Sequence, residues 1–109
     1  MALYMHQVAY TAESWSAQIK NSDNRMGQPV RAACESAGGK VVGSWYCFGD
    51  YDVVFIADRP DNVSASTVSL AIAAGGACKA LKTTVLMTGG EAVAAMKKTA
   101  AVTHKPAGR

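Results

Sequence analysis

Two apolar runs joined by a Gly-Asp pair most constrain what this chain can fold into. Residues 40–48, KVVGSWYCF, are rich in β-branched and aromatic side chains, and residues 51–58, YDVVFIAD, resume that composition after Gly49-Asp50. Such runs are typical of strands, and a Gly-Asp pair between them is typical of a tight reversal. The sequence therefore predicts a β-hairpin, with the carboxylate of Asp52 just inside its second strand.

Alternating and turn-bounded patterns predict two further strands. Residues 2–11 alternate so that Tyr4, His6, Val8 and Tyr10 share one face, and residues 78–88 form another run suited to a strand. Both faces of these strands are largely apolar.

The rest of the chain contains residues that are typical of the starts and ends of helices. Thr11 can cap a first helix that breaks at 21–24, with Trp15 and Ile19 on its inner face. A second helical stretch is expected from the helical spacing of Met26, Val30, Ala33, Cys34 and Ala37, and it ends at the glycines at 38–39. Pro29 predicts either a kink in this stretch or a late start near Gln28. Further helices are expected over about 63–74, capped by Asp61 or Asn62, and over 90–101, after a capping box formed by Thr88 and Glu91.

The order of these elements predicts the fold class. Strand, helical segment, strand, strand, helix, strand and helix give an α+β, ferredoxin-like βαββαβ arrangement: an antiparallel four-stranded sheet with helices on one face and an extra C-terminal helix. The helices can cover only one apolar face of the sheet. A second copy is the natural cover for the other face, which predicts a dimeric α+β barrel.

Composition and charge narrow the class of protein further. At 109 residues, 50% apolar and 17% charged, the chain suits one domain over 1–101 with a flexible tail at 102–109, and it favours a homodimer or higher homo-oligomer. The absence of a long apolar run or a signal-peptide pattern leads us to expect a cytoplasmic protein with no membrane partner. The net charge of +3 lies mostly in residues 97–98 and the tail, so we expect no nucleic-acid partner.

The hairpin residues resemble a known family. WYCFGDYDVVFIAD, with YMHQVAYT and LKTTVLMT, is similar to the GYD-domain family of small bacterial proteins, over about residues 2–100, and its signature falls on Gly49, Tyr51 and Asp52. The resemblance implies a dimeric α+β barrel whose role is largely unassigned. The Gly-Asp-Tyr-Asp run is also similar to the ligand-binding domains of leucine-responsive-type transcription regulators, although this chain lacks their helix-turn-helix.

Four side chains are candidates for a ligand site. Asp52 can either clamp the hairpin through backbone N–H groups or orient a ligand and act as a general base. His6 can either be hydrogen-bonded in the core or, if its face lines a barrel, bind haem iron or act as an acid or base. Tyr46 can supply a polar group to an aromatic-lined pocket. Lys82 can either lie at a rim or, if buried, pair with Asp52 or hold an anion.

Cysteine and metal chemistry have little support in the sequence. Cys34, Cys47 and Cys78 are widely spaced with no C-x-x-C pair, so we expect reduced, buried thiols. No second ligand stands at metal-binding spacing from His6, and we expect no metal and no cofactor.

The sequence leaves three functions open. The first is a homo-oligomeric binding or scaffolding domain, which could hold a small metabolite in the barrel or at the subunit interface. The second is an enzyme of the dimeric α+β barrel type, a monooxygenase, haem-degrading or isomerase-like protein that uses His6, Tyr46 and Asp52. The third is a stand-alone module that senses an effector.

Overall fold

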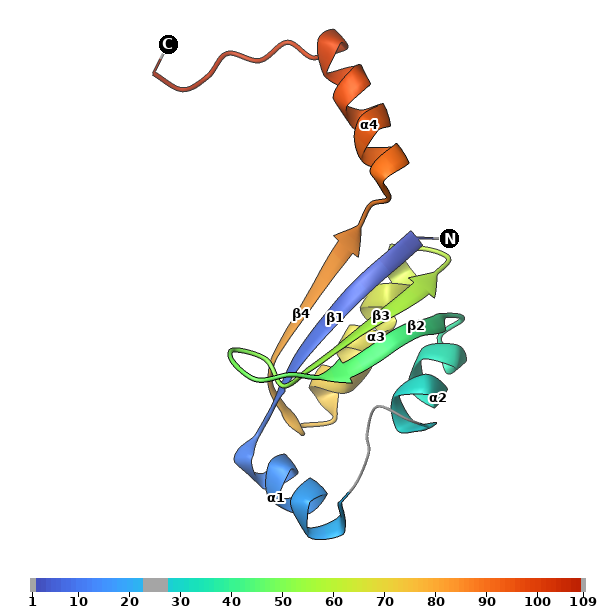
Figure 1. Ribbon diagram of the computed structural model, residues 1–109, viewed down its shortest axis with the longest axis vertical. Helices are drawn as coiled ribbons and strands as arrows, with labels where there is room; N and C mark the ends of the chain where they lie inside the picture. Colours follow the sequence, from blue (N-terminus) through green and yellow to red (C-terminus); the bar gives the residue numbers. More distant parts are fainter. Residues whose placement is uncertain (1, 23–27, 109) are drawn as a thin grey trace.

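The computed structural model describes residues 2–22 and 28–108 (Figure 1). Its four strands form one antiparallel sheet in the order β2-β3-β1-β4. This arrangement confirms the predicted α+β, ferredoxin-like fold with an extra C-terminal helix. In chain order, the elements are β1 (Ala2–Tyr10), α1 (Ala12–Asn21), α2 (Gln28–Ser36), β2 (Lys40–Tyr46), β3 (Val53–Arg59), α3 (Asn62–Ala74), β4 (Cys78–Leu86), α4 (Gly89–Lys98) and the 3-10 helix η1 (Thr99–Ala101).

The helix starts follow the predicted caps. The hydroxyl of Thr11 accepts a hydrogen bond from the Ser14 N–H at the start of α1. Asp61 accepts from the Ser64 N–H at the start of α3, and this hydrogen bond lowers the pKa of the Asp61 carboxyl. Thr88 and Glu91 form the predicted capping box at the start of α4.

The hairpin between β2 and β3 has a longer loop than a tight Gly-Asp reversal. The loop covers residues 47–52, and Asp52 is its last residue, so the prediction that Asp52 lies inside the strand is wrong. The Cys47 N–H donates to the Asp52 carbonyl at 2.7 Å, and this bond closes the loop. Gly49 has a φ of 127°, which side-chain-bearing residues rarely adopt.

Two other sequence expectations fail for reasons of tertiary placement. Ile19 was expected on the inner face of the first helix, but 73% of its surface is exposed. The reason is that α1 lies beyond the end of the sheet, where only part of it meets the core (Figure 1).

The expectation of three buried thiols holds for one cysteine. Cys34 is buried, whereas Cys47 and Cys78 are only half-buried. Met26, which was counted with the second helical stretch, lies outside the described residues.

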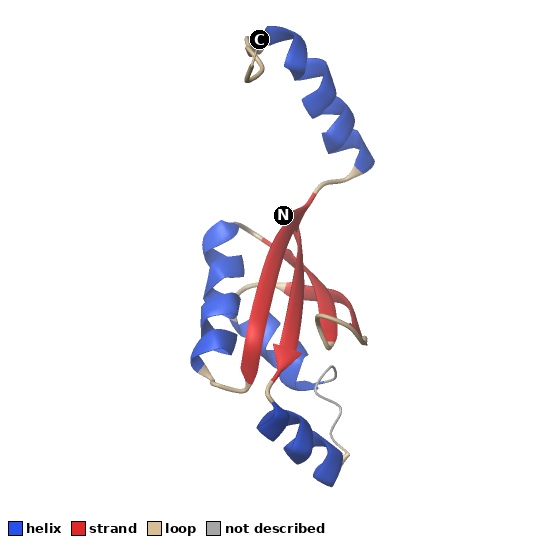
Figure 2. Ribbon diagram, turned by 90° about the vertical axis from the view of Figure 1, so that its left-hand side faces the viewer, coloured by secondary structure: helices blue, strands red, loops and turns tan. Residues whose placement is uncertain are grey.

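The sheet has one face covered by helices. Figure 2 shows α2 and α3 against the same side of the strands. On this side the strands bury alternating residues, including Tyr4, His6, Val8, Val53, Phe55 and Ala57.

The opposite side of the sheet, the open face, has no described helix over it (Figure 2). The strand registers place Met5 beside Ile56 and beside Thr84, Gln7 beside Val54, and Trp45 beside Val54. These side chains are half-buried by one another, except for the exposed Trp45.

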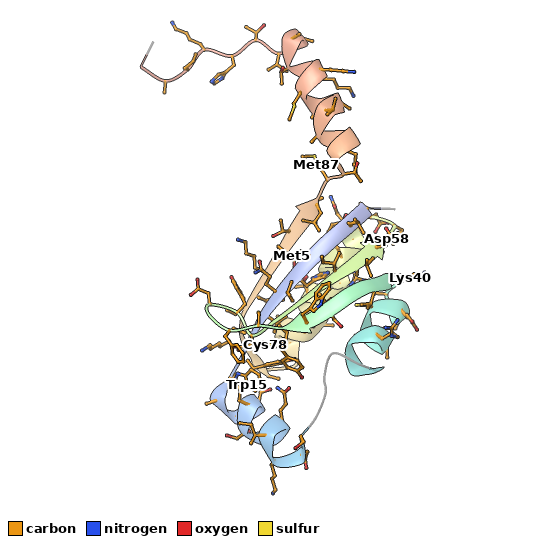
Figure 3. All side chains as sticks on the ribbon, viewed as in Figure 1. Met5, Trp15, Lys40, Asp58, Cys78 and Met87 are labelled. Atoms are coloured by element: carbon orange, nitrogen blue, oxygen red, sulfur yellow. The ribbon has the colours of Figure 1, made fainter. Side chains whose placement is uncertain are left out.

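The C-terminal helix α4 stands away from the sheet. It follows β4 after Met87 and Thr88 and extends beyond the end of the strand (Figure 3). It has no buried residue, and Val93 and Met96 are 48% and 66% exposed. The extended placement raises the radius of gyration to 17.3 Å, compared with about 13 Å for a compact chain of this length. Within the described ranges, no helix has both the length and the apolar character needed to span a membrane.

Candidate functional site

Asp52 joins the hairpin loop to β1 and α1. Its Oδ2 accepts a hydrogen bond from the Tyr10 backbone N–H at 2.8 Å and from the Trp15 indole N–H at 3.2 Å. The Asp52 backbone N–H donates to the carbonyl of Val8 at 2.8 Å. The carboxylate therefore fixes the point where β1 ends and α1 begins. Both side-chain contacts use the same carboxylate oxygen, Oδ2, which links the hairpin loop to β1 and α1.

Tyr46 belongs to the same region as Asp52. The Tyr46 hydroxyl donates to Gln18 Oε1 at 3.2 Å, and the Tyr46 ring lies 6.2 Å from the Trp15 ring. Gln18 Nε2 donates in turn to Ser14 Oγ at 3.3 Å. Asp52, Trp15, Tyr46 and Gln18 thus form one cluster at the end of the sheet near α1, which we call the Asp52 cluster.

His6 lies in a separate, fully buried cluster under α3. Its ring stacks on Phe55 with ring centres 4.7 Å apart. His6 Nδ1 lies 3.2 Å from Thr83 Oγ1 and 3.4 Å from Ser69 Oγ. Its other nitrogen, Nε2, lies 3.4 Å from Nε of Arg59. Because a guanidinium can only donate, Nε2 is the acceptor, and in the neutral ring the proton is on Nδ1.

The surroundings keep the His6 imidazole neutral. Burial, and then the positive charge of Arg59, lower the pKa of His6 from 6.5 to about 4. The ring contacts Ser69 of α3 and is fully buried, so it faces the helices and does not line the open face, where a barrel interior was expected.

Arg59 is a fully buried cation at the end of α2. Besides His6, its guanidinium donates to the carbonyl of Cys34 at 3.4 Å and to the Cys34 sulfur at 3.2 Å. The carbonyl groups at the C-terminal end of a helix carry partial negative charge, so the end of α2 partly compensates the buried positive charge. A side chain on Gly39 would collide with the Arg59 guanidinium, so the glycine makes room for the cation. His6, Arg59 and Cys34 form the Arg59 cluster.

Lys82 lies apart from both clusters. It is exposed on β4, and its register partner is Gln7, which places it on the open face. The structure therefore brings Tyr46 and Asp52 into one cluster and leaves His6 and Lys82 elsewhere. His6 precedes Tyr10, whose N–H binds Asp52, by four residues, which corresponds to roughly 13 Å along a strand.

A cavity of about 620 Å³ lies between the two clusters, on the helix side of the sheet. We call it the helix-side cavity. Val8, Tyr10, Val53 and Phe55 line it from the strands, and residues of α1, α2 and α3 form its walls. None of the four predicted site residues lines the cavity, but Gln18 and Cys34 connect it to the Asp52 and Arg59 clusters. The described residues contain no group of three or more His, Cys, Asp or Glu side chains that could hold a metal ion.

A family model described as the GYD domain matches residues 4–96. The chain belongs to the GYD domain family. The match covers the strands, the loop at 47–52 and both clusters of this GYD domain, as well as most of α4.

A solved structure supports the fold. It is described as "crystal structure of FFRP-DM1" and has a TM-score of 0.54 and 10% sequence identity, and the match covers 80% of this chain and 100% of that chain. Another, a hypothetical protein PHS023 from Pyrococcus horikoshii, has a TM-score of 0.49 and 10% identity, over 81% of this chain and 92% of that chain. A search of curated proteins finds no match.

Three residues of the two clusters were not among the candidates predicted from the sequence: Arg59, Gln18 and Cys34. One signal could have found Arg59: it continues the alternation of Val53, Phe55 and Ala57, all of which face the helices. Gln18 gave no comparable signal, because its burial depends on the placement of α1 and on contact with Tyr46, 28 residues away.

Proposed function

We propose that this GYD domain is a homodimeric binding or scaffolding domain whose two copies pair through their open faces. The observation that carries the proposal is the apolar open face, which no described helix covers. Leaving apolar area in contact with water is unfavourable, and a second sheet at about 10 Å is the usual way to bury such a face.

The distribution of charge on the open face supports this pairing. Its middle holds Met5, Val54 and Ile56, which are uncharged, together with the exposed indole of Trp45, which lies across Gly43. The charged side chains lie toward its margins: Lys40 beside Asp58 on the strands at one side, and Lys82 on β4 at the other. An apolar centre with a polar rim is the usual anatomy of a protein interface.

Helix α4 offers further exposed apolar side chains. A stable interface buries about 800 Å² on each partner, from roughly 20–30 residues. The open face alone supplies fewer residues than this, whereas α4 adds the exposed side chains of Val93 and Met96, and the connection before it adds Met87. A helix as short as α4 is marginal on its own in water, so its good caps suit a helix that packs on a partner. We infer that α4 of one copy packs against the second copy.

The enzyme alternative gains no support from the described side chains. A general acid and base must reach the same substrate atoms, yet His6 lies in the Arg59 cluster and Asp52 lies in the Asp52 cluster.

Native mass spectrometry over a dilution series tests the proposal. We expect the wild-type protein to be a dimer at micromolar concentration and Ile56→Lys to be a monomer, because lysine places a charge in the middle of the paired faces. Trp45→Lys repeats the test at an exposed position that is not needed for folding. Leu70→Lys, on the exposed side of α3, is the matched control and should remain dimeric. A monomeric wild-type protein, or dissociation by Leu70→Lys but not by Trp45→Lys, would exclude the open face as the interface.

A further inference from the structure

The helix-side cavity has the size of a small-molecule site. Its volume of about 620 Å³ lies within the range of roughly 300–1,000 Å³ found for ligand pockets, and it is far larger than the voids left by ordinary core packing. We propose that it binds an uncharged, mainly apolar small molecule that carries one hydrogen-bonding group. This site lies on the opposite side of the sheet from the proposed dimer interface, so neither proposal depends on the other.

The inner surface of the cavity is made of buried apolar side chains. Val8, Val53 and Phe55 from the strands and Val68 from α3 are each 1–3% exposed over the whole residue, although they border the cavity. They form the floor of the cavity, which opens to solvent between the helices, where lining residues such as Ala33 and Ala71 are exposed. An apolar ligand there would cover the exposed apolar part of the lining, which is favourable.

The described part of the lining carries no charge. All of the described residues that border the cavity are uncharged. The nearby guanidinium of Arg59 is engaged by His6 and Cys34, and the carboxylate of Asp52 accepts from Tyr10 and Trp15. An ionised ligand would lose its hydration without meeting an opposite charge, which is costly. The lining therefore selects for uncharged molecules.

Gln18 supplies the polar contact. It is 6% exposed and borders the cavity from α1, where the Tyr46 hydroxyl and Ser14 Oγ hold its amide in place. An amide has two N–H donors and an oxygen with two acceptor positions. These two hydrogen bonds use one donor and one acceptor position, so the group can bind one more donor or acceptor on a ligand. A fixed polar group in an apolar pocket is the usual way in which a site orients its ligand.

Two related fluorescent dyes test the selection for uncharged ligands. N-phenyl-1-naphthylamine is uncharged and has one N–H, whereas 1-anilinonaphthalene-8-sulfonate has the same rings with an added sulfonate. We expect the uncharged dye to bind saturably, with one molecule per chain, and the sulfonate to bind at least about tenfold more weakly. Equal affinity for the two dyes, or no saturable binding of the uncharged dye, would overturn the proposal.

Matched variants on α3 locate the dye. Ala71 borders the cavity and Ala73 does not, and both are exposed, so a tryptophan at either position leaves the core intact. We expect Ala71→Trp to weaken binding of the uncharged dye by about tenfold or more, and Ala73→Trp to change it less than about twofold. Equal binding to the two variants, or loss of binding in Trp45→Lys on the open face, would place the dye elsewhere and overturn the proposal.

The cysteines give an independent measure of the site. Cys78 borders the cavity and Cys47 does not, and both are half-buried. We expect the uncharged dye to slow the reaction of Cys78 with N-ethylmaleimide while the reaction of Cys47 stays the same, as followed by peptide mass spectrometry. Equal protection of both thiols, or of neither, would contradict binding in the cavity.

Discussion

The guanidinium of Arg59 donates to the imidazole of His6, with Arg59 Nε 3.4 Å from His6 Nε2 and both side chains fully buried. The contact joins the last residue of β3 to the middle of β1. Burial, and then the positive charge of this partner of Nε2, lower the pKa of His6, so the histidine stays neutral although both of its nitrogens are hydrogen-bonded.

We predict that acid weakens the fold through His6. The pKa of His6 is lowered in the folded state, so between pH 6.5 and about 4 the unfolded chain binds a proton that the folded chain does not. Stability that is fully present above pH 6.5 should therefore fall as the pH drops, by up to about 1.4 kcal/mol per pH unit and about 3 kcal/mol in all. Urea unfolding at pH 7, 6 and 5 measures this slope.

Two histidine variants separate this effect from general acid unfolding. His6→Gln should remove most of the slope between pH 7 and pH 5, because glutamine can accept from Arg59 but does not titrate. His104→Gln, in the exposed C-terminal segment, should keep the wild-type slope. A wild-type slope in His6→Gln would show that another group is responsible.

We predict that Arg59→Met raises the pKa of His6. The substitution removes the positive charge beside the ring and leaves the burial, so the pKa should rise from about 4 but stay below 6.5. Titration of the imidazole C–H signals by NMR gives the value directly. An unchanged pKa would mean that burial alone sets it.

We predict that Arg59→Lys destabilises the protein more than Arg59→Met. Lysine keeps a buried charge but cannot reach His6 and both Cys34 acceptors at once, whereas methionine removes the charge. A difference of roughly 1–3 kcal/mol in the free energy of unfolding is expected. Equal losses would argue that the hydrogen bonds of Arg59 contribute little.

We predict that Asp52→Ala costs roughly 2–3 kcal/mol of stability, because the Tyr10 N–H and the Trp15 indole both lose their acceptor. Asp52→Asn keeps an acceptor oxygen and should cost less. The exposed Asp50→Ala, in the same loop, is the control and should change stability by less than about 0.5 kcal/mol. A double-mutant cycle with Trp15→Phe tests the hydrogen bond between Asp52 and Trp15. Additive losses of stability would show that this hydrogen bond contributes nothing.

We predict that Thr88→Ala weakens the proposed dimer more than it weakens the fold. Loss of the cap costs about 1 kcal/mol of helix stability in each copy, so about 2 kcal/mol in the homodimer, which corresponds to roughly thirtyfold in the dissociation constant if α4 packs on the partner. Thr103→Ala, beyond η1, is the control. Analytical ultracentrifugation measures the constant, and an unchanged value would separate α4 from the interface.

Features that depend on neighbouring residues could be predicted from the sequence. The caps at Thr11 and Thr88 each join residues three apart, and the alternation in β3 gives its buried side directly from residue types. These local rules, together with the order of elements, were enough to predict the ferredoxin-like fold.

The contacts of the candidate site could not be predicted in the same way. Asp52 binds Trp15 across 37 residues, and Arg59 binds His6 across 53 residues, so both contacts exist only after the strands have paired. The expected position of Ile19 failed for a related reason: helical spacing shows which residues share a face, but the placement of α1 decides which face is covered.

The glycine at position 39 constrains how the sequence can change. Any side chain there meets Arg59, which is buried and hydrogen-bonded and cannot easily move aside, as well as the carbonyls of Cys34 and Asp58. Replacement of the glycine alone should therefore be rejected in a selection for folded protein. Shortening of residue 59 removes one of these obstacles, so an accepted replacement at position 39 should arise together with, or after, a smaller residue at position 59. The two positions should behave as an epistatic pair in a deep mutational scan.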